Sequence, residues 1–283
     1  MLSKRIETHI RDGNRVCLVF TVFVVPWLKT ETSDRVRRLT IDRPDRKNAI
    51  PTDGWPTLAA AFEEFEKSDD RVLVVTGAGG DFCAGADLDA DRSSGPMSVA
   101  GAHRRMKLVE RAATSLHRIT KPTIAAVDGV AVGAGMNLAL GCDVVIATER
   151  ARFSEIFVRR GLTVDFGGTW LLPRIVGLQR AKEMALSARF VDAEEAGRLG
   201  IAMEIVAVDR LYGRADELAR SFLTGAPIGQ MFAKQLLDAS FESSFSESVS
   251  WEGQSQSIVL GTEDAVEGVS AFLEKRDPNW RGR

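Results

Sequence analysis

Apolar residues form two kinds of pattern in the first two thirds of the chain. Residues 71–80 form an apolar run that continues into a glycine turn, and residues 36–41 (VRRLTI) form an earlier strand-like stretch. Such runs predict strands, and one that is apolar on both faces fits a sheet covered by helices. Residues 52–70 and 99–118 carry apolar side chains at helical spacing instead. This alternation predicts an α/β core.

The pattern becomes mainly helical after Pro173. Five segments there carry apolar residues three and four positions apart, and they are 178–187, 192–199, 209–223, 226–240 and 262–274. We found no internal repeat and no low-complexity linker. The chain is therefore expected to end in a helical cap or oligomerisation region.

The first 30 residues differ from the rest. Four basic residues precede an apolar run at 16–28, and they are Lys4, Arg5, Arg11 and Arg15. The run is shorter than the roughly 20 residues of a membrane span, and no small-residue cleavage site follows it. We expect a first strand with an upstream extension. A secretory signal and an interfacial membrane anchor are the alternatives.

Composition narrows the function classes. The chain has 283 residues, 45% of them hydrophobic and 27% charged, with a formal net charge of −2. That balance is typical of a globular protein with one large domain, and it lacks the basic surplus of a nucleic-acid-binding protein. Cys17, Cys83 and Cys142 are widely spaced, which predicts neither a metal site nor a disulfide framework and fits a cytoplasmic location.

Two glycine-rich stretches, 76–88 and 127–140, are candidates for chemistry. Glycine lets the backbone approach a phosphate or an oxyanion because no Cβ stands in the way. The second stretch does not fit a dinucleotide-binding fingerprint, since Leu138 stands where a third glycine is needed. The remaining interpretation of this stretch is the start of a helix, whose free N–H groups can bind an anion or an oxyanion. The alternative for the first stretch is a plain strand-to-loop turn.

Asp165 lies between apolar residues and the Gly167-Gly168 pair. A buried, unpaired carboxylate costs several kcal/mol unless it is neutralised or hydrogen-bonded. Asp165 is therefore either a functional acid or the cap of a helix beginning at Gly167, a common role for aspartate.

Five motifs in order resemble the crotonase superfamily of enoyl-CoA hydratases and isomerases. They are RPDRKNAI, GAGGDFCAGADL, KPTIAAVDGVAVGAGMNLALGCDVVIA, GLTVDFGGTWLLPRIVG and EGVSAFLEKRDPNW, and the likeness extends over roughly residues 33–283. The resemblance implies an α/β fold with a spiral core of ββα turns and C-terminal helices that form trimers, often stacked as hexamers. We accordingly expect an extension at 1–30, an acyl-CoA-binding core at 31–210 and a helical region at 211–283.

The resemblance also implies an acyl-CoA thioester as substrate. We expect no cofactor besides the coenzyme A of the substrate, no metal because the histidines and cysteines are scattered, and no nucleic-acid or membrane partner. The backbone N–H groups of Ala86 and Ala134 match those that hold the thioester oxygen. The residues that match the coenzyme A region are Arg46, Lys47, Ala84, Asp87 and Leu88. For Arg46 and Lys47 the alternative is a solvated surface loop.

The chain departs from this family at the two glutamates that activate water in hydratases. Asn137 and Phe157 occupy those positions, and Glu155 is close to the second but does not fit the spacing through Gly161. The resemblance leaves Asp165 as the acid of the site, as in enoyl-CoA isomerases and in ring-opening isomerases of phenylacetyl-CoA degradation. We therefore favour an isomerase with Asp165 as acid and base. A hydratase, a dehalogenase-like enzyme with Asp165 as nucleophile, and a non-catalytic acyl-CoA binder remain alternatives.

Overall fold

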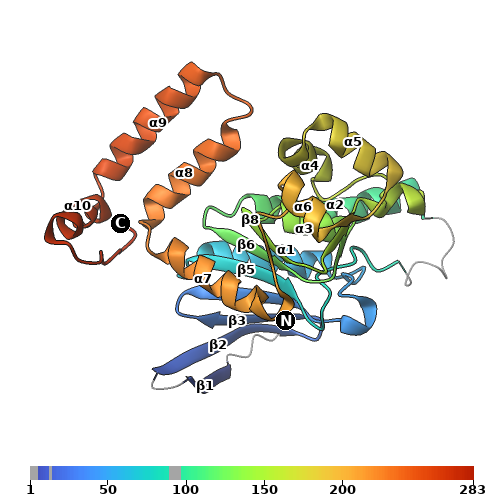
Figure 1. The fold of residues 1–283 in the computed structure, drawn as a ribbon, viewed down its shortest axis with the longest axis horizontal. Helices are drawn as coiled ribbons and strands as arrows, with labels where there is room; N and C mark the ends of the chain where they lie inside the picture. The colour runs from blue at the N-terminus through green and yellow to red at the C-terminus, as the bar shows by residue number, and fades with distance from the viewer. Residues whose placement is uncertain (1–5, 13–14, 89–96) are drawn as a thin grey trace.

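A computed structural model describes residues 6–12, 15–88 and 97–283, with side chains described from Val25 onward. Its larger sheet has the strand order β1-β2-β3-β4-β5-β6-β8-β11 (Figure 1). These strands are Ile6–Asp12, Arg15–Val25, Leu28–Ser33, Val36–Ile41, Val72–Gly77, Thr123–Val127, Val144–Thr148 and Glu204–Val206. Strands β1 to β4 pair antiparallel, and β4, β5, β6, β8 and β11 run parallel. The predicted α/β core is therefore present.

Strand β5 shows why this sheet is covered on both faces. All six of its residues are buried. Leu73 and Val75 join the main core, to which helices α1 (Trp55–Lys67) and α2 (Val99–His117) contribute. Val72 and Val74 point the other way and pack with helix α7 (Leu211–Leu223). The two-residue period of a strand divides its apolar side chains between two cores.

The N-terminal run predicted as a first strand is present as β2, which pairs with β1 and β3. Among the residues that the structure describes, no helix has the length and the apolar character needed to cross a membrane.

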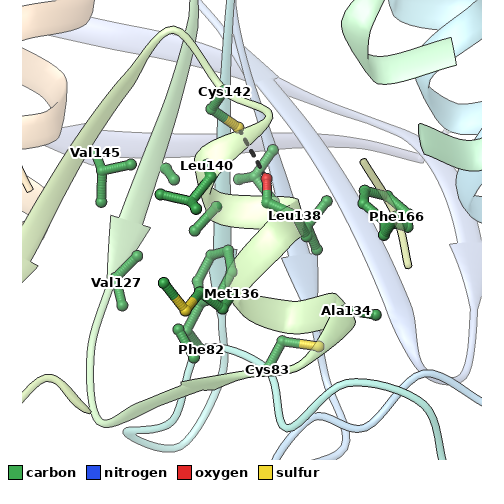
Figure 2. Close-up of a cluster of buried hydrophobic side chains, with 14 of the residues drawn as sticks. Phe82, Cys83, Val127, Ala134, Met136, Leu138, Leu140, Cys142, Val145 and Phe166 are labelled. Carbon is green, nitrogen blue, oxygen red and sulfur yellow. Dashed lines mark hydrogen bonds between the residues drawn. The ribbon is translucent and has the colours of Figure 1, made fainter. Parts of the chain in front are cut away.

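A short helix and a second, three-stranded sheet lie against the main sheet. The second sheet has the order β10-β9-β7 and consists of Val191–Asp192, Arg152–Ser154 and Val130–Val132. Helix α3 (Ala134–Leu140) follows β7, and all seven of its residues are buried. Figure 2 shows α3 surrounded by apolar side chains, with Ala134 at its first turn near Cys83.

The last third of the chain is helical, as predicted. The helices α4, α5, α6, α8, α9 and α10 span Gly168–Val176, Leu178–Ser187, Ala193–Leu199, Pro227–Ala239, Phe245–Leu260 and Glu263–Glu274. Helices α8 to α10 extend away from the α/β body (Figure 1). The sequence analysis missed α9, whose apolar residues are spread around the helix instead of forming one stripe. Its start is fixed locally, since Ser244 and Glu247 form a reciprocal capping box.

Candidate active site

The two glycine-rich stretches come into direct contact. A Cβ at Gly135 would lie 2.1 Å from the carbonyl oxygen of Cys83, and one at Gly85 would lie 2.8 Å from the carbonyl oxygen of Val132. Any larger residue would push the two segments apart, so these glycines are required by the close approach. A hydrogen bond from the Val132 N–H to the Cys83 carbonyl, 3.0 Å long, joins the same segments.

This contact brings Ala86 and Ala134 to one cavity. Both residues line a hollow of about 460 Å³. Ala134 is the first residue of α3, whose opening N–H groups have no acceptor within the helix. Neither amide donates to a backbone carbonyl of the described loops and turns. Two free N–H groups at one cavity can stabilise an oxyanion.

Asp165 lines the same cavity. Its side chain is half-buried, and its Oδ1 atom is buried without a hydrogen-bond partner among the described residues. Burial raises the pKa of the Asp165 carboxyl to about 6, against a smaller lowering by the charge of Arg105. Asp165 thus combines an unsatisfied oxygen with a pKa near neutrality.

Asp165 does not cap the following helix. Helix α4 has Gly167 as its N-cap and no side-chain capping bond. The chain turns into α4 at Phe166, whose φ of 51° is left-handed. That conformation costs about 1–3 kcal/mol, and Phe166 is held in it by burial in the core and by ring contact with Trp55 at 5.9 Å. The helix-cap alternative for Asp165 is therefore wrong.

Three of the residues expected at coenzyme A line the cavity, and they are Lys47, Ala84 and Leu88. The other two, Arg46 and Asp87, are not among its lining residues. Arg46 lies in the short 3-10 helix 44–46. The carboxylate of Asp87 accepts a hydrogen bond from Arg43 at 2.8 Å. The basic pair Arg159 and Arg160, which the sequence analysis missed, also lines the cavity; two adjacent arginines were the only signal for it.

Phe157 lines the cavity, whereas Glu155 and Asn137 are fully buried. The Asn137 Nδ2 atom donates to the backbone oxygen of Asp165 at 2.9 Å and to Glu155 Oε2 at 3.4 Å. Glu155 is therefore a neighbour of Asp165, a relation that its sequence position did not reveal.

Comparison with known proteins identifies the family of this chain. Residues 31–283 match the Enoyl-CoA hydratase/isomerase family. The chain is 38% identical over 257 residues to 1,2-epoxyphenylacetyl-CoA isomerase of Escherichia coli, covering 88% of this chain and 95% of that protein. It is also 38% identical over 263 residues to a probable enoyl-CoA hydratase of Rhodobacter capsulatus, covering 90% and 98%.

Solved structures agree with this assignment. An enoyl-CoA hydratase/isomerase from Cupriavidus metallidurans superimposes with a TM-score of 0.82 at 38% identity, covering 92% of this chain and 98% of that one. The predicted crotonase fold is confirmed, and the chain belongs to the enoyl-CoA hydratase/isomerase family.

Proposed function

We propose that this enzyme moves the double bond of an enoyl-CoA from the 3,4 to the 2,3 position, with Asp165 as its acid and base. The observation that carries the proposal is the shared cavity of Asp165, Ala86 and Ala134. A protein that only binds acyl-CoA has no need of an unpartnered carboxylate beside two free amides. An isomerase needs all three.

The ionised Asp165 carboxylate would remove a proton from C2 of the substrate. The electrons of the broken C2–H bond form a dienolate, whose negative charge moves to the thioester oxygen. The N–H groups of Ala86 and Ala134 would stabilise that oxygen, and one such donor contributes roughly 3–4 kcal/mol to a transition state. The protonated Asp165 would then return the proton to C4, leaving the double bond between C2 and C3.

A pKa near neutrality suits a group that both takes and returns a proton. At pH 7 an acid with a pKa of about 6 is largely ionised and still becomes a competent donor after it takes a proton. Burial between apolar neighbours supplies this property, because it penalises the charged form.

The environment of Asp165 favours isomerisation over hydration. Hydration requires polar groups that hold a water molecule beside the double bond. Phe157 offers none, and the Asn137 amide already donates to the protein backbone. Glu155 has no exposed surface and is not among the residues that line the cavity.

Basic residues support a coenzyme A thioester as the ligand. Lys47, Arg159 and Arg160 line the cavity, and coenzyme A carries several negatively charged phosphate oxygens. Arg46 and Asp87 stay predictions as further coenzyme A contacts.

We also infer that the chain forms trimers or hexamers through its C-terminal helices. Helices α9 and α10 leave large apolar side chains exposed, among them Phe245, Ile258 and Phe272, at 85%, 57% and 82% of their surface. Exposed apolar surface on this scale is typical of an interface. Free Cys83 and Cys142 fit the reducing cytoplasm in which we place the enzyme.

A parallel assay tests the proposed function. We expect wild-type enzyme to convert 3-enoyl-CoA to 2-enoyl-CoA with negligible water addition. Asp165→Asn should lower the rate by about 100- to 10,000-fold, the usual contribution of a general acid–base group. Asp209→Asn, at an exposed site, is the matched control. Hydration that survives in Asp165→Asn would contradict the assignment, and no turnover by wild type on either isomer would favour the dehalogenase-like or binder alternatives.

A further inference from the structure

A second carboxylic acid is buried beside Asp165. Glu155 directly follows β9, and its side chain has no exposed surface. Its Oε1 atom has no hydrogen-bond partner among the described residues, and no lysine or arginine of that part of the chain lowers its pKa. A buried carboxylate without a cation is costly, and such a group usually holds its proton instead.

Asn137 connects this acid to the candidate active site. One amide nitrogen donates both to Glu155 Oε2 and to the backbone oxygen of Asp165. Gly168 leaves the space for this amide, since a Cβ there would lie 2.4 Å from Asn137 Nδ2. The Asn137 amide therefore touches Glu155 on one side and the Asp165 peptide on the other.

The charges around the pair differ for its two members. Arg105 of α2 acts on Asp165 and favours its ionised form. The Asp165 charge acts on Glu155 and favours its protonated form. Among the described residues, no other charged side chain from α3, α4 or β9 perturbs Glu155, so its surroundings contain only like charge.

We propose that Glu155 is a positioning residue for Asp165: as a neutral acid it supports the Asn137 amide that holds the Asp165 peptide, and when ionised it acts on Asp165 as a buried negative charge. The inference rests on the proposed function, because it assigns Asp165 as the working acid. It adds a second proton-binding group that does not touch the substrate.

The order of ionisation follows from burial. Burial raises the pKa of Glu155 to about 7, with a smaller rise from Asp165 and an opposing effect of the Asn137 hydrogen bond. Glu155 is fully buried beside the Asp165 charge, whereas Asp165 is half-buried and is acted on by Arg105, so Asp165 loses its proton first. Between the two ionisation steps the pair carries one negative charge, located on Asp165. Two interacting acids titrate in two steps that belong to the pair.

The expected consequence is a two-step pH dependence. The negative charge of ionised Asp165 makes Glu155 harder to ionise, so the pair releases its protons over a wider pH range than one acid does. Glu155→Gln keeps an oxygen that can accept from Asn137 but never becomes charged. Asp165 should then ionise in a single step, near the pH of the first step in wild type.

Infrared spectroscopy tests the coupling without any assay of activity. The carbonyl stretch of protonated carboxyl groups is followed against pH in wild type, Glu155→Gln, Asp165→Asn and the exposed-site control Glu149→Gln. The band lost in Glu155→Gln identifies Glu155. We expect this group to ionise at lower pH in Asp165→Asn than in wild type, because the charge that raises its pKa has been removed. An unchanged midpoint, or a Glu155 ionised throughout, would overturn the proposal.

The pH dependence of kcat supplies the second readout. Glu155→Gln should keep the first rise of kcat with pH and remove the second change that the ionisation of Glu155 causes in wild type, with KM little changed. Glu155→Ala, which removes the support of Asn137, should lower kcat about tenfold, a usual effect of losing a neighbour that orients a functional group. A profile in Glu155→Gln with the shape and midpoint of wild type would overturn the inference. If the infrared coupling is present but no isomerisation occurs, the proposed function fails and the proton-sharing pair remains.

Discussion

Helices α3 and α9 show two ways of using apolar residues in one chain. All seven residues of α3 are buried, whereas α9 has no buried residue over Phe245–Leu260. Helix α3 lies inside the α/β body, and α9 stands away from it (Figure 1). Phe245 and Ile258 of α9 are exposed. The surroundings of α3 are complete within one chain. Those of α9 leave large apolar side chains exposed, which fits the assembly proposed above.

The candidate active site and the proposed assembly surface therefore lie in different parts of the chain. The cavity with Ala86, Ala134 and Asp165 is built by segments of the body that pack on each other. The C-terminal helices join the body through α7, which packs on the sheet, and through polar contacts of α8 such as that from Lys234 to Asp143 at 2.9 Å. A change in α3 should therefore damage folding and the candidate site together, whereas a change in α9 should alter assembly and leave the body intact.

The largest effect is expected at Gly135. Gly135→Ala would place a Cβ 2.1 Å from the Cys83 carbonyl oxygen, and both backbones are fixed by neighbouring hydrogen bonds. Overpacking of this kind costs about 3 kcal/mol. The free energy of unfolding, measured in urea, should fall by about that amount, and activity should be lost because Ala86 and Ala134 move apart.

Gly253→Ala in α9 is the matched control. Nothing lies within 4 Å of a Cβ at this position. Alanine is favoured over glycine inside a helix by about 1 kcal/mol, so this variant should be as stable as wild type or slightly more so. Equal destabilisation by the two substitutions would remove the distinction between the two helices.

A smaller effect on the fold, but a large one on assembly, is expected from charges on the C-terminal helices. The double variant Ile258→Glu and Phe272→Glu places two carboxylates on exposed apolar positions. We expect light scattering to report a change from trimer or hexamer to single chains, with the circular dichroism of the body retained. An unchanged mass would show that these helices do not form the interface.

The sequence predicted those parts of the fold whose signals are local. Strand β4 has the predicted bounds of 36–41, and α5 those of 178–187. The start of α9 carries a local capping signal at Ser244, but its apolar residues do not form the single stripe that marks a helix packed on its own chain. Periodicity reports burial within the chain, so a helix with no buried face is poorly predicted by it.

The candidate site could be predicted in part. Asp165, Ala86 and Ala134 were named from motifs, and the structure brings them to one cavity. Glu155 was weighed by its spacing from Gly161 and set aside. Its importance depends on the Asn137 amide, which reaches it from a helix 18 positions earlier in the chain. A buried contact of this kind has no signature in the local sequence.

The central claim is that one carboxylate, Asp165, takes the proton from C2 and returns it to C4. The most direct test uses 3-enoyl-CoA carrying deuterium at C2, with the product analysed by mass spectrometry and NMR for label at C4. We predict that wild-type enzyme transfers part of the deuterium to C4, and that Asp165→Asn transfers none at a comparable rate. Transfer that continues unchanged in Asp165→Asn would contradict the account.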